Sequence, residues 1–141
     1  MKLLFSGKVN FSYEQLRISD SSPNMETWPE WQGGVDPAQQ IASSLDTVLL
    51  VVASEYVIST VNIHLYVGNN KRDSMPIPPC FTAWAGMPMQ FDSQKIDIGD
   101  VVDFGEHIFS LEEKSYTMFL YSSPDLQERD EVFICLTKLF N

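Results

Sequence analysis

The stretch "YVISTVNIHLYVGNN", residues 56 to 70, predicts the fold class because its apolar side chains fall on alternate positions. One face of the extended chain carries Val57, Ser59, Val61, Ile63, Leu65 and Val67, and the other carries Ile58, Thr60, Asn62, His64 and Tyr66. A period of two with one more apolar face is typical of a β-strand that lies on a core. The Gly-Asn-Asn at its end is a turn signal, so we expect the strand to end there.

Strand signals recur along the rest of the chain. In "LLFSGKVNFSY" (residues 3–13) the odd-numbered positions are apolar apart from Gly7, which is expected to mark a bulge. "TVLLVVA" (residues 47–53) is a continuous apolar run that predicts a strand buried on both faces. Further strands are expected near residues 81–85, 89–92, 95–98, 107–111, 115–121 and 132–140.

Eight to ten short strands predict an all-β fold, and we expect a single-domain antiparallel β-sandwich over residues 1–141. At most one short helix is expected, at "PAQQIAS" (residues 37–43), where Asp36 can cap the first turn and Pro37 can begin it. No internal repeat or linker divides the chain.

The composition is typical of a globular protein, with 44% hydrophobic and 20% charged residues. The apolar run in the opening "MKLLFSGKVNF" is too short for a signal peptide, and no stretch reaches membrane length. We therefore expect a cytoplasmic protein with no membrane partner. Cys80 and Cys135 are expected to be buried thiols, and no metal or other cofactor is expected.

Acidic residues outnumber basic ones by nineteen to nine, which gives a net charge of −10. The imbalance is concentrated in residues 92–141, where eleven acids and four bases give a net charge of −7. Such a chain is not expected to bind nucleic acid, because phosphate affinity comes from clustered Lys and Arg. A lopsided negative surface instead favours a basic protein partner, although solubility alone explains the same count.

Sequence motifs of hydrolytic or phosphate-binding enzymes are missing: the chain has no G-x-S-x-G, H-E-x-x-H or P-loop. His64 falls on the less apolar face of its strand, so we interpret it as a surface or cross-strand residue rather than a catalytic base. We expect a non-enzymatic protein without catalytic residues.

The most acidic stretch, "FDSQKIDIGDVVDFGE", supplies candidate partner-binding carboxylates. They are Asp92, Asp97, Asp100, Asp103 and Glu106. Loop aspartates of a β-sandwich can also bind calcium, but this spacing does not follow the EF-hand pattern, so a solvated acidic edge is preferred.

Two of the three tryptophans, Trp28 and Trp31, lie in "PNMETWPEWQGG", a segment that its prolines and glycines exclude from a central strand. In one interpretation they plug an open end of the sandwich. In the other, at least one is exposed and anchors a partner, as aromatic residues at interfaces often do.

The run "FSYEQLRISDSS" followed by "TWPEWQGG" resembles the competence protein ComJ family of bacterial nuclease inhibitors. The matching residues are Tyr13, Gln15, Ile18, Asp20, Trp28 or Trp31, and Gln32-Gly33. The later "KIDIGDVVDFGEHIFSLEEKSYTMFLY" is similar in the order of its strands. The resemblance implies a non-enzymatic protein that binds a DNA-degrading enzyme and blocks its active site.

Three classes of function therefore stay open. The first is an acidic inhibitor or immunity-type protein whose basic partner is a nuclease. The second is a β-sandwich that binds a small ligand or carbohydrate, with Trp28, Trp31 and Trp84 as a stacking platform. The third is a structural assembly module. The sequence leaves the oligomeric state undecided.

Overall fold

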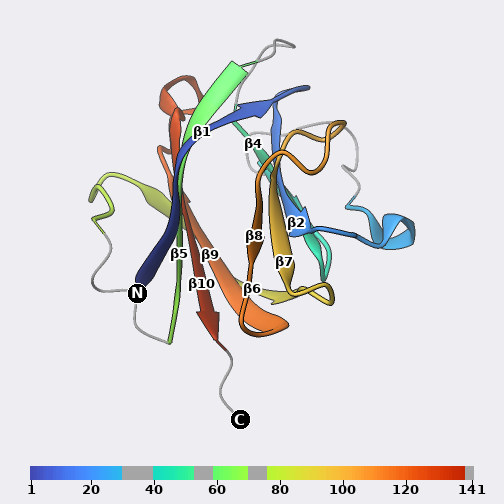
Figure 1. The fold of residues 1–141 in the computed structure, drawn as a ribbon. Coiled ribbons are helices and arrows are strands. Elements are labelled where there is room, and N and C mark those ends of the chain that lie inside the picture. The colour runs from blue at the N-terminus through green and yellow to red at the C-terminus, as the bar shows by residue number, and fades with distance from the viewer. Residues whose placement is uncertain (30–39, 53–58, 70–75, 139–141) are drawn as a thin grey trace.

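The computed structural model describes residues 1–29, 40–52, 59–69 and 76–138, which form two five-stranded sheets (Figure 1). Sheet A has the order β1 (Lys2–Phe11), β5 (Ser59–Gly68), β10 (Glu131–Lys138), β9 (Ser115–Ser122) and β6 (Thr82–Gln90). Sheet B has the order β3 (Ile41–Ser43), β4 (Thr47–Val51), β2 (Gln15–Asp20), β7 (Lys95–Gly99) and β8 (Ile108–Ser110). The expected all-β sandwich is confirmed.

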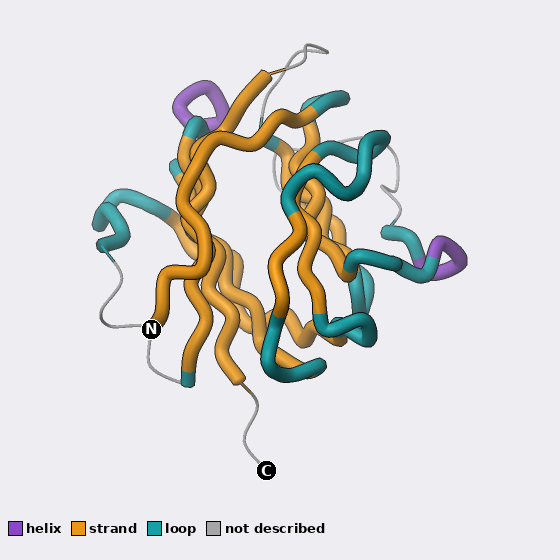
Figure 2. The backbone as a smooth tube through the Cα atoms, viewed as in Figure 1, coloured by secondary structure: helices purple, strands orange, loops and turns teal. Residues whose placement is uncertain are grey.

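Helices are scarce in these ranges, as Figure 2 shows. Two three-residue 3-10 helices occur, η1 (Met25–Thr27) and η2 (Leu126–Glu128). The expected helix at residues 37–43 was wrong in its second half, because Ile41–Ser43 is strand β3, and its first half lies outside the described residues. No helix in the described ranges is long and apolar enough to cross a membrane.

The core lies between the inner faces of the two sheets. Val61, Ile63 and Leu65 of β5 are at most 1% exposed, as the alternation of the stretch 56–70 predicts. From sheet B, Leu16 and Ile18 of β2 meet them in the same cluster. Burying one such side chain stabilises the fold by roughly 1.5–3 kcal/mol, so this cluster holds the sheets together.

The chain passes from sheet A to sheet B in the turn between β1 and β2. Tyr13 and Glu14 adopt positive φ angles of 56° and 66° there, which side chains other than glycine rarely do. The turn explains why the apolar positions change from odd to even numbers between Phe11 and Leu16: a second strand begins, in the other sheet.

Two details of sheet A differ from expectation. The pairing of β10 with β5 is parallel, although the other strand pairs are antiparallel. The irregularity of β1 lies between Leu3 and Phe5 rather than at Gly7. Glycine is favoured at position 7 for another reason. A Cβ there would lie 2.9 Å from Cζ of Phe5, whose ring packs over this position.

The expectation of two buried thiols is correct for Cys135 and wrong for Cys80. Cys135 is fully buried in β10, whereas Cys80 is exposed in the proline-rich segment before β6. His64 is a cross-strand residue, as expected. Its Nδ1 lies 2.8 Å from Ser6 Oγ of β1, and its Nε2 lies 2.8 Å from a carboxylate oxygen of Glu131 at the start of β10.

A buried arginine, Arg129, joins the two sheets at one end of the sandwich. It follows η2 in the β9–β10 connection and is 3% exposed. Its Nη1 donates to the Val51 carbonyl of β4 (2.8 Å), and its Nε donates to the Ser123 carbonyl (2.9 Å). The guanidinium carbon lies 4.8 Å from the ring centre of Trp84, which packs on the core. Trp84 therefore has a structural role within sheet A.

Candidate functional site

The connection between β7 and β8, residues 100–107, contains three of the five predicted carboxylates, and we call it the 100–107 loop. It extends from one end of sheet B (Figure 1). Two apolar side chains are exposed on it, Val102 by 58% and Phe104 by 39%. Two carboxylates, Asp103 and Glu106, are exposed beside them. Aromatic and aliphatic side chains bordered by charge are the usual composition of a protein-binding surface.

A buried arginine lies under the 100–107 loop. Arg17 belongs to β2, where Leu16 and Ile18 point into the core, so alternation turns Arg17 to the outer face of sheet B. The side chain is nevertheless 0% exposed because the 100–107 loop covers it. Burial lowers the pKa of Arg17, and the charge of Asp97 opposes that shift, so the guanidinium needs its partners to remain buried as a cation.

Arg17 fixes the 100–107 loop through backbone carbonyls. Its Nε donates to the carbonyl of Asp100 (2.7 Å), and its Nη2 donates to the carbonyl of Asp103 (3.4 Å). A third link runs back into β2, where Nη1 donates to Ser19 Oγ (2.7 Å). The planar, five-donor guanidinium can serve all of these acceptors at once, which a lysine cannot.

Two of the predicted carboxylates, Asp97 and Asp100, are internal. Asp97 is 1% exposed, forms an ion pair with Arg17 (3.2 Å), and accepts from the backbone N–H of Gly105 (2.9 Å). Asp100 is 9% exposed, and its Oδ1 accepts from the backbone N–H groups of Val102 (2.7 Å) and Asp103. The expectation that both belong to an exposed acidic edge is wrong, because each is used to hold the backbone of the 100–107 loop.

Phe104 connects this buried network to the tryptophan segment. The guanidinium carbon of Arg17 lies 3.8 Å from the Phe104 ring centre, and the Trp28 ring is stacked on Phe104 with 6.0 Å between centres and 27° between planes. Trp28 is half-buried and follows η1. It therefore packs against the outer side of sheet B rather than across an end of the sandwich. Trp31 lies outside the described residues.

The remaining predicted residue, Asp92, lies apart from the others. It is exposed in the turn before β7 and accepts from Nε2 of Gln90 (3.1 Å). The 100–107 loop follows the other end of β7, and a five-residue strand separates them by roughly 15 Å. The structure thus brings together Trp28, Asp103 and Glu106 of the predicted site and leaves Asp92 elsewhere.

Arg17, Val102 and Phe104 are not among the site residues predicted from the sequence. The two apolar residues interrupt the acidic run "DVVDFGE", and this alternation of apolar and acidic residues within a loop was the available signal. Arg17 gave no signal, since a basic residue between Leu16 and Ile18 fits a strand with one wet face.

The described residues offer no site for calcium on this loop. No group of three or more His, Cys, Asp or Glu side chains that could hold a metal ion occurs among them. Two of the tryptophans expected to form a carbohydrate platform lie apart. Trp28 stacks on Phe104 outside sheet B, while Trp84 packs on the core from sheet A.

Comparison of structures confirms the expected resemblance to ComJ at the level of the fold. The crystal structure of ComJ from Bacillus subtilis, described as an inhibitor of the DNA degrading activity of NucA, is similar over 98% of both chains, with a TM-score of 0.63 and 13% identity. The structure described as crocagin biosynthetic gene J is similar over 99% of this chain and 98% of that one, with a TM-score of 0.63 and 9% identity. No protein-family model matches the chain, and no curated protein matches it by sequence.

Proposed function

We propose that this protein is a non-enzymatic inhibitor that binds a basic nuclease through the 100–107 loop and Trp28. The observation that carries the proposal is the pairing of exposed apolar side chains, Val102 and Phe104, with exposed carboxylates, Asp103 and Glu106. The backbone of their loop is held in place by the buried Arg17. ComJ, which shares the fold, is an inhibitor of a DNA-degrading enzyme, and this supports the inhibitor class.

The charge of the chain supports a basic partner. A nuclease site attracts phosphate with positive charge, so carboxylates on a rigid loop can occupy it in place of the nucleic acid backbone. Asp103 and Glu106 are the carboxylates of the predicted site that remain exposed on the loop, and the net charge of −10 adds long-range attraction.

The fixed loop favours tight binding. Ordering a mobile side chain on association costs about 0.5–1.5 kcal/mol, and a loop held by Arg17, Asp97 and Asp100 is already ordered. Phe104 stands on the Arg17 guanidinium and beside Trp28, so a partner meets one preformed aromatic surface.

The test is a plasmid-cleavage assay with a panel of basic DNA-degrading endonucleases and equimolar inhibitor. We expect inhibition of at least one enzyme, and we expect it to weaken as salt is raised from about 0.05 to 0.5 M. Phe104→Ala is expected to raise the inhibition constant about thirtyfold, as for a hot-spot residue. The double variant Asp103→Lys/Glu106→Lys is expected to slow association and weaken the salt dependence.

The matched control is Glu128→Lys, which reverses an exposed charge in η2, outside the loop. It is expected to leave the inhibition constant within about threefold, since this charge lies outside the proposed interface. Inhibition that Phe104→Ala and the double charge reversal leave unchanged, in variants that melt like the parent protein, would reject this surface. Absence of inhibition across the panel would reject the nuclease partner.

A further inference from the structure

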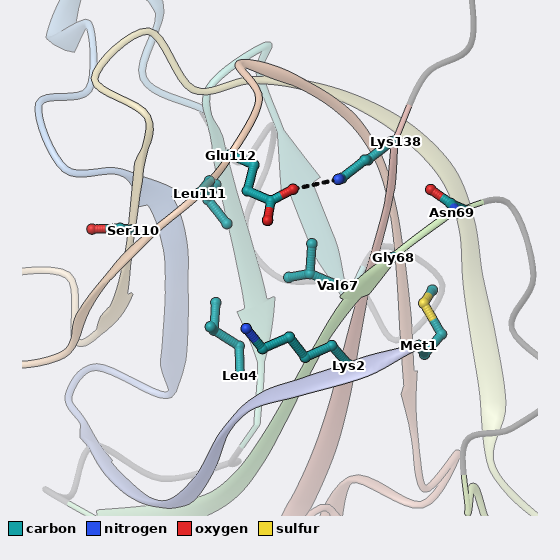
Figure 3. A pocket seen from close by; sticks show the side chains of 10 residues that line it. All are labelled: Met1, Lys2, Leu4, Val67, Gly68, Asn69, Ser110, Leu111, Glu112 and Lys138. Atoms are coloured by element: carbon teal, nitrogen blue, oxygen red, sulfur yellow. Dashed lines mark hydrogen bonds and ion pairs between the residues drawn. The ribbon is translucent and has the colours of Figure 1, made fainter.

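A cavity of about 440 Å³ lies at the end of β8 opposite to the 100–107 loop, and neither the acidic surface nor the fold accounts for it (Figure 3). Its walls come from the start of β1, the end of β5, the end of β10 and the β8–β9 connection. The lining residues that matter here are Lys2, Leu4, Val67, Leu111, Glu112 and Lys138.

The floor of the cavity is apolar. Leu111 is 6% exposed and belongs to the core cluster, while Leu4 and Val67 are partly buried and pack against that cluster. These three side chains come from three separate segments of the chain, so they form a surface that can receive an alkyl or aryl group. Removing such a group from water is favourable, and each further methylene that is buried adds to the gain.

The rim of the cavity is cationic, in a protein that is otherwise strongly acidic. Lys2 and Lys138 reach into it from opposite sides of Val67, and Glu112 extends between them (Figure 3). Two lysines against one glutamate give the side chains that line this cavity a formal charge of +1, whereas the whole chain carries −10.

Glu112 occupies the place that a ligand's anionic group would take. Its carboxylate lies 2.5 Å from Nζ of Lys138, with the Glu112 side chain 78% exposed and that of Lys138 27% exposed. The hydrogen bond to Lys138 and its charge hold the pKa of Glu112 below its ordinary value, and the charge of Lys2 acts in the same direction. An exposed glutamate can rotate into solvent at little cost, since exposed ion pairs are weak.

We propose that this cavity binds a small amphipathic monoanion, a carboxylate on an apolar alkyl body. The carboxylate lies between Lys2 and Lys138 after Glu112 has turned away, and the alkyl body lies on Leu4, Val67 and Leu111. The site is separate from the proposed nuclease-binding loop, so either can fail without the other.

The test is a titration of the full chain with octanoate, followed by calorimetry and by the methyl resonances of Val67 and Leu111. We expect saturable binding with shifts at both residues. Octan-1-ol lacks the charge and acetate lacks the alkyl body, so each is expected to bind at least about tenfold more weakly. Equal binding of octanoate and octan-1-ol would reject a role for the cationic rim. Equal binding of octanoate and acetate would reject a role for the apolar floor.

Charge variants distinguish a ligand site from an ordinary surface ion pair. Lys2→Met and Lys138→Met are each expected to weaken octanoate binding about tenfold, the effect of one lost charged hydrogen bond. Glu112→Gln is expected to tighten it several-fold, because the competing carboxylate is gone. Lys114→Met, in the same connection but outside the cavity lining, is the control and is expected to change nothing. Absence of octanoate binding, or no effect of any of the three cavity variants, would overturn the proposal.

Discussion

Arg17 and Phe104 form a pair in which a fully buried cation supports a partly exposed ring, with 3.8 Å between the guanidinium carbon and the ring centre. The pair joins the interior of sheet B to the surface that we propose binds a nuclease. Changes at Arg17 should therefore affect both folding and the shape of the 100–107 loop.

Replacing Arg17 with methionine is expected to lower the free energy of unfolding by about 3–5 kcal/mol, because Asp97 would stay buried without its ion-pair partner. Urea unfolding measures the change. The double variant Arg17→Met/Asp97→Leu is expected to recover part of the loss, since no uncompensated charge remains. Lys95→Met, on the exposed start of β7, is the control and should stay within about 0.5 kcal/mol of the parent. An Arg17→Met protein as stable as this control would contradict the prediction.

Replacing Asp100 with alanine is expected to loosen the 100–107 loop. The Asp100 carboxylate accepts from the backbone N–H groups of Val102 and Asp103, and both would lose their acceptor. We expect their amide hydrogens to exchange at least about tenfold faster, with a loss of about 1–2 kcal/mol in global stability. Hydrogen exchange followed by NMR measures both effects. Asp92→Ala, at the other end of β7, should leave these two amides unchanged, and equal protection in both variants would refute the role of Asp100.

The stability of the protein is expected to fall at alkaline pH, in part through Tyr116. Burial raises the pKa of the Tyr116 hydroxyl above its ordinary value of 10.0. Above pH 10 the unfolded chain ionises this group while the folded chain keeps its proton. The contribution of the Tyr116 hydroxyl to the free energy of unfolding is thus complete below pH 10, and it is lost as the pH rises toward the folded pKa.

Tyr116→Phe is expected to reduce this alkaline loss. At neutral pH the variant should be about 1 kcal/mol less stable, because the backbone N–H of Glu113 donates to the Tyr116 hydroxyl (3.0 Å). Urea unfolding at a series of pH values between about 8 and 11 gives the comparison. Tyr13→Phe is the control, since Tyr13 is 52% exposed. Identical pH dependence in the parent and the Tyr116→Phe protein would disprove the assignment.

The two thiols are expected to react at very different rates. Cys80 is exposed and Cys135 is 0% exposed, so iodoacetamide should alkylate Cys80 at least about a hundredfold faster in the folded protein. Mass spectrometry of digested samples measures both rates. In the unfolded chain the difference should vanish. A Cys80→Ser protein that reacts as fast as the parent would show that Cys135 is accessible.

Much of the sandwich could be predicted from local pattern. The alternation that put Val61, Ile63 and Leu65 on one face holds in β5, and the continuous run Thr47–Val51 is buried along its whole length. Both cases depend on the period of two along a single strand, which a sequence displays directly. The parallel pairing of β10 with β5 could not be predicted, because the strands are far apart in the chain and their own patterns are the same in either direction.

The candidate site was only partly predictable. The acidic run and Trp28 were found, but no local pattern separates Asp103 and Glu106, which reach solvent, from Asp97 and Asp100, which do not. Asp97 alternates with Ile96 and Ile98 as a wet-face residue would. Its burial comes from the 100–107 loop, which folds back over the outer face of sheet B.

The sequence by itself determined the class of the fold, the positions of most strands and the excess of negative charge, since each of these follows from residue type and local period. Only the tertiary structure decided which charges are available to a partner. A carboxylate is exposed or internal according to what the rest of the chain places over it. Here Arg17 of β2 pairs with the buried Asp97 and binds backbone carbonyls of the 100–107 loop, while the side chains of Asp103, Phe104 and Glu106 stay exposed.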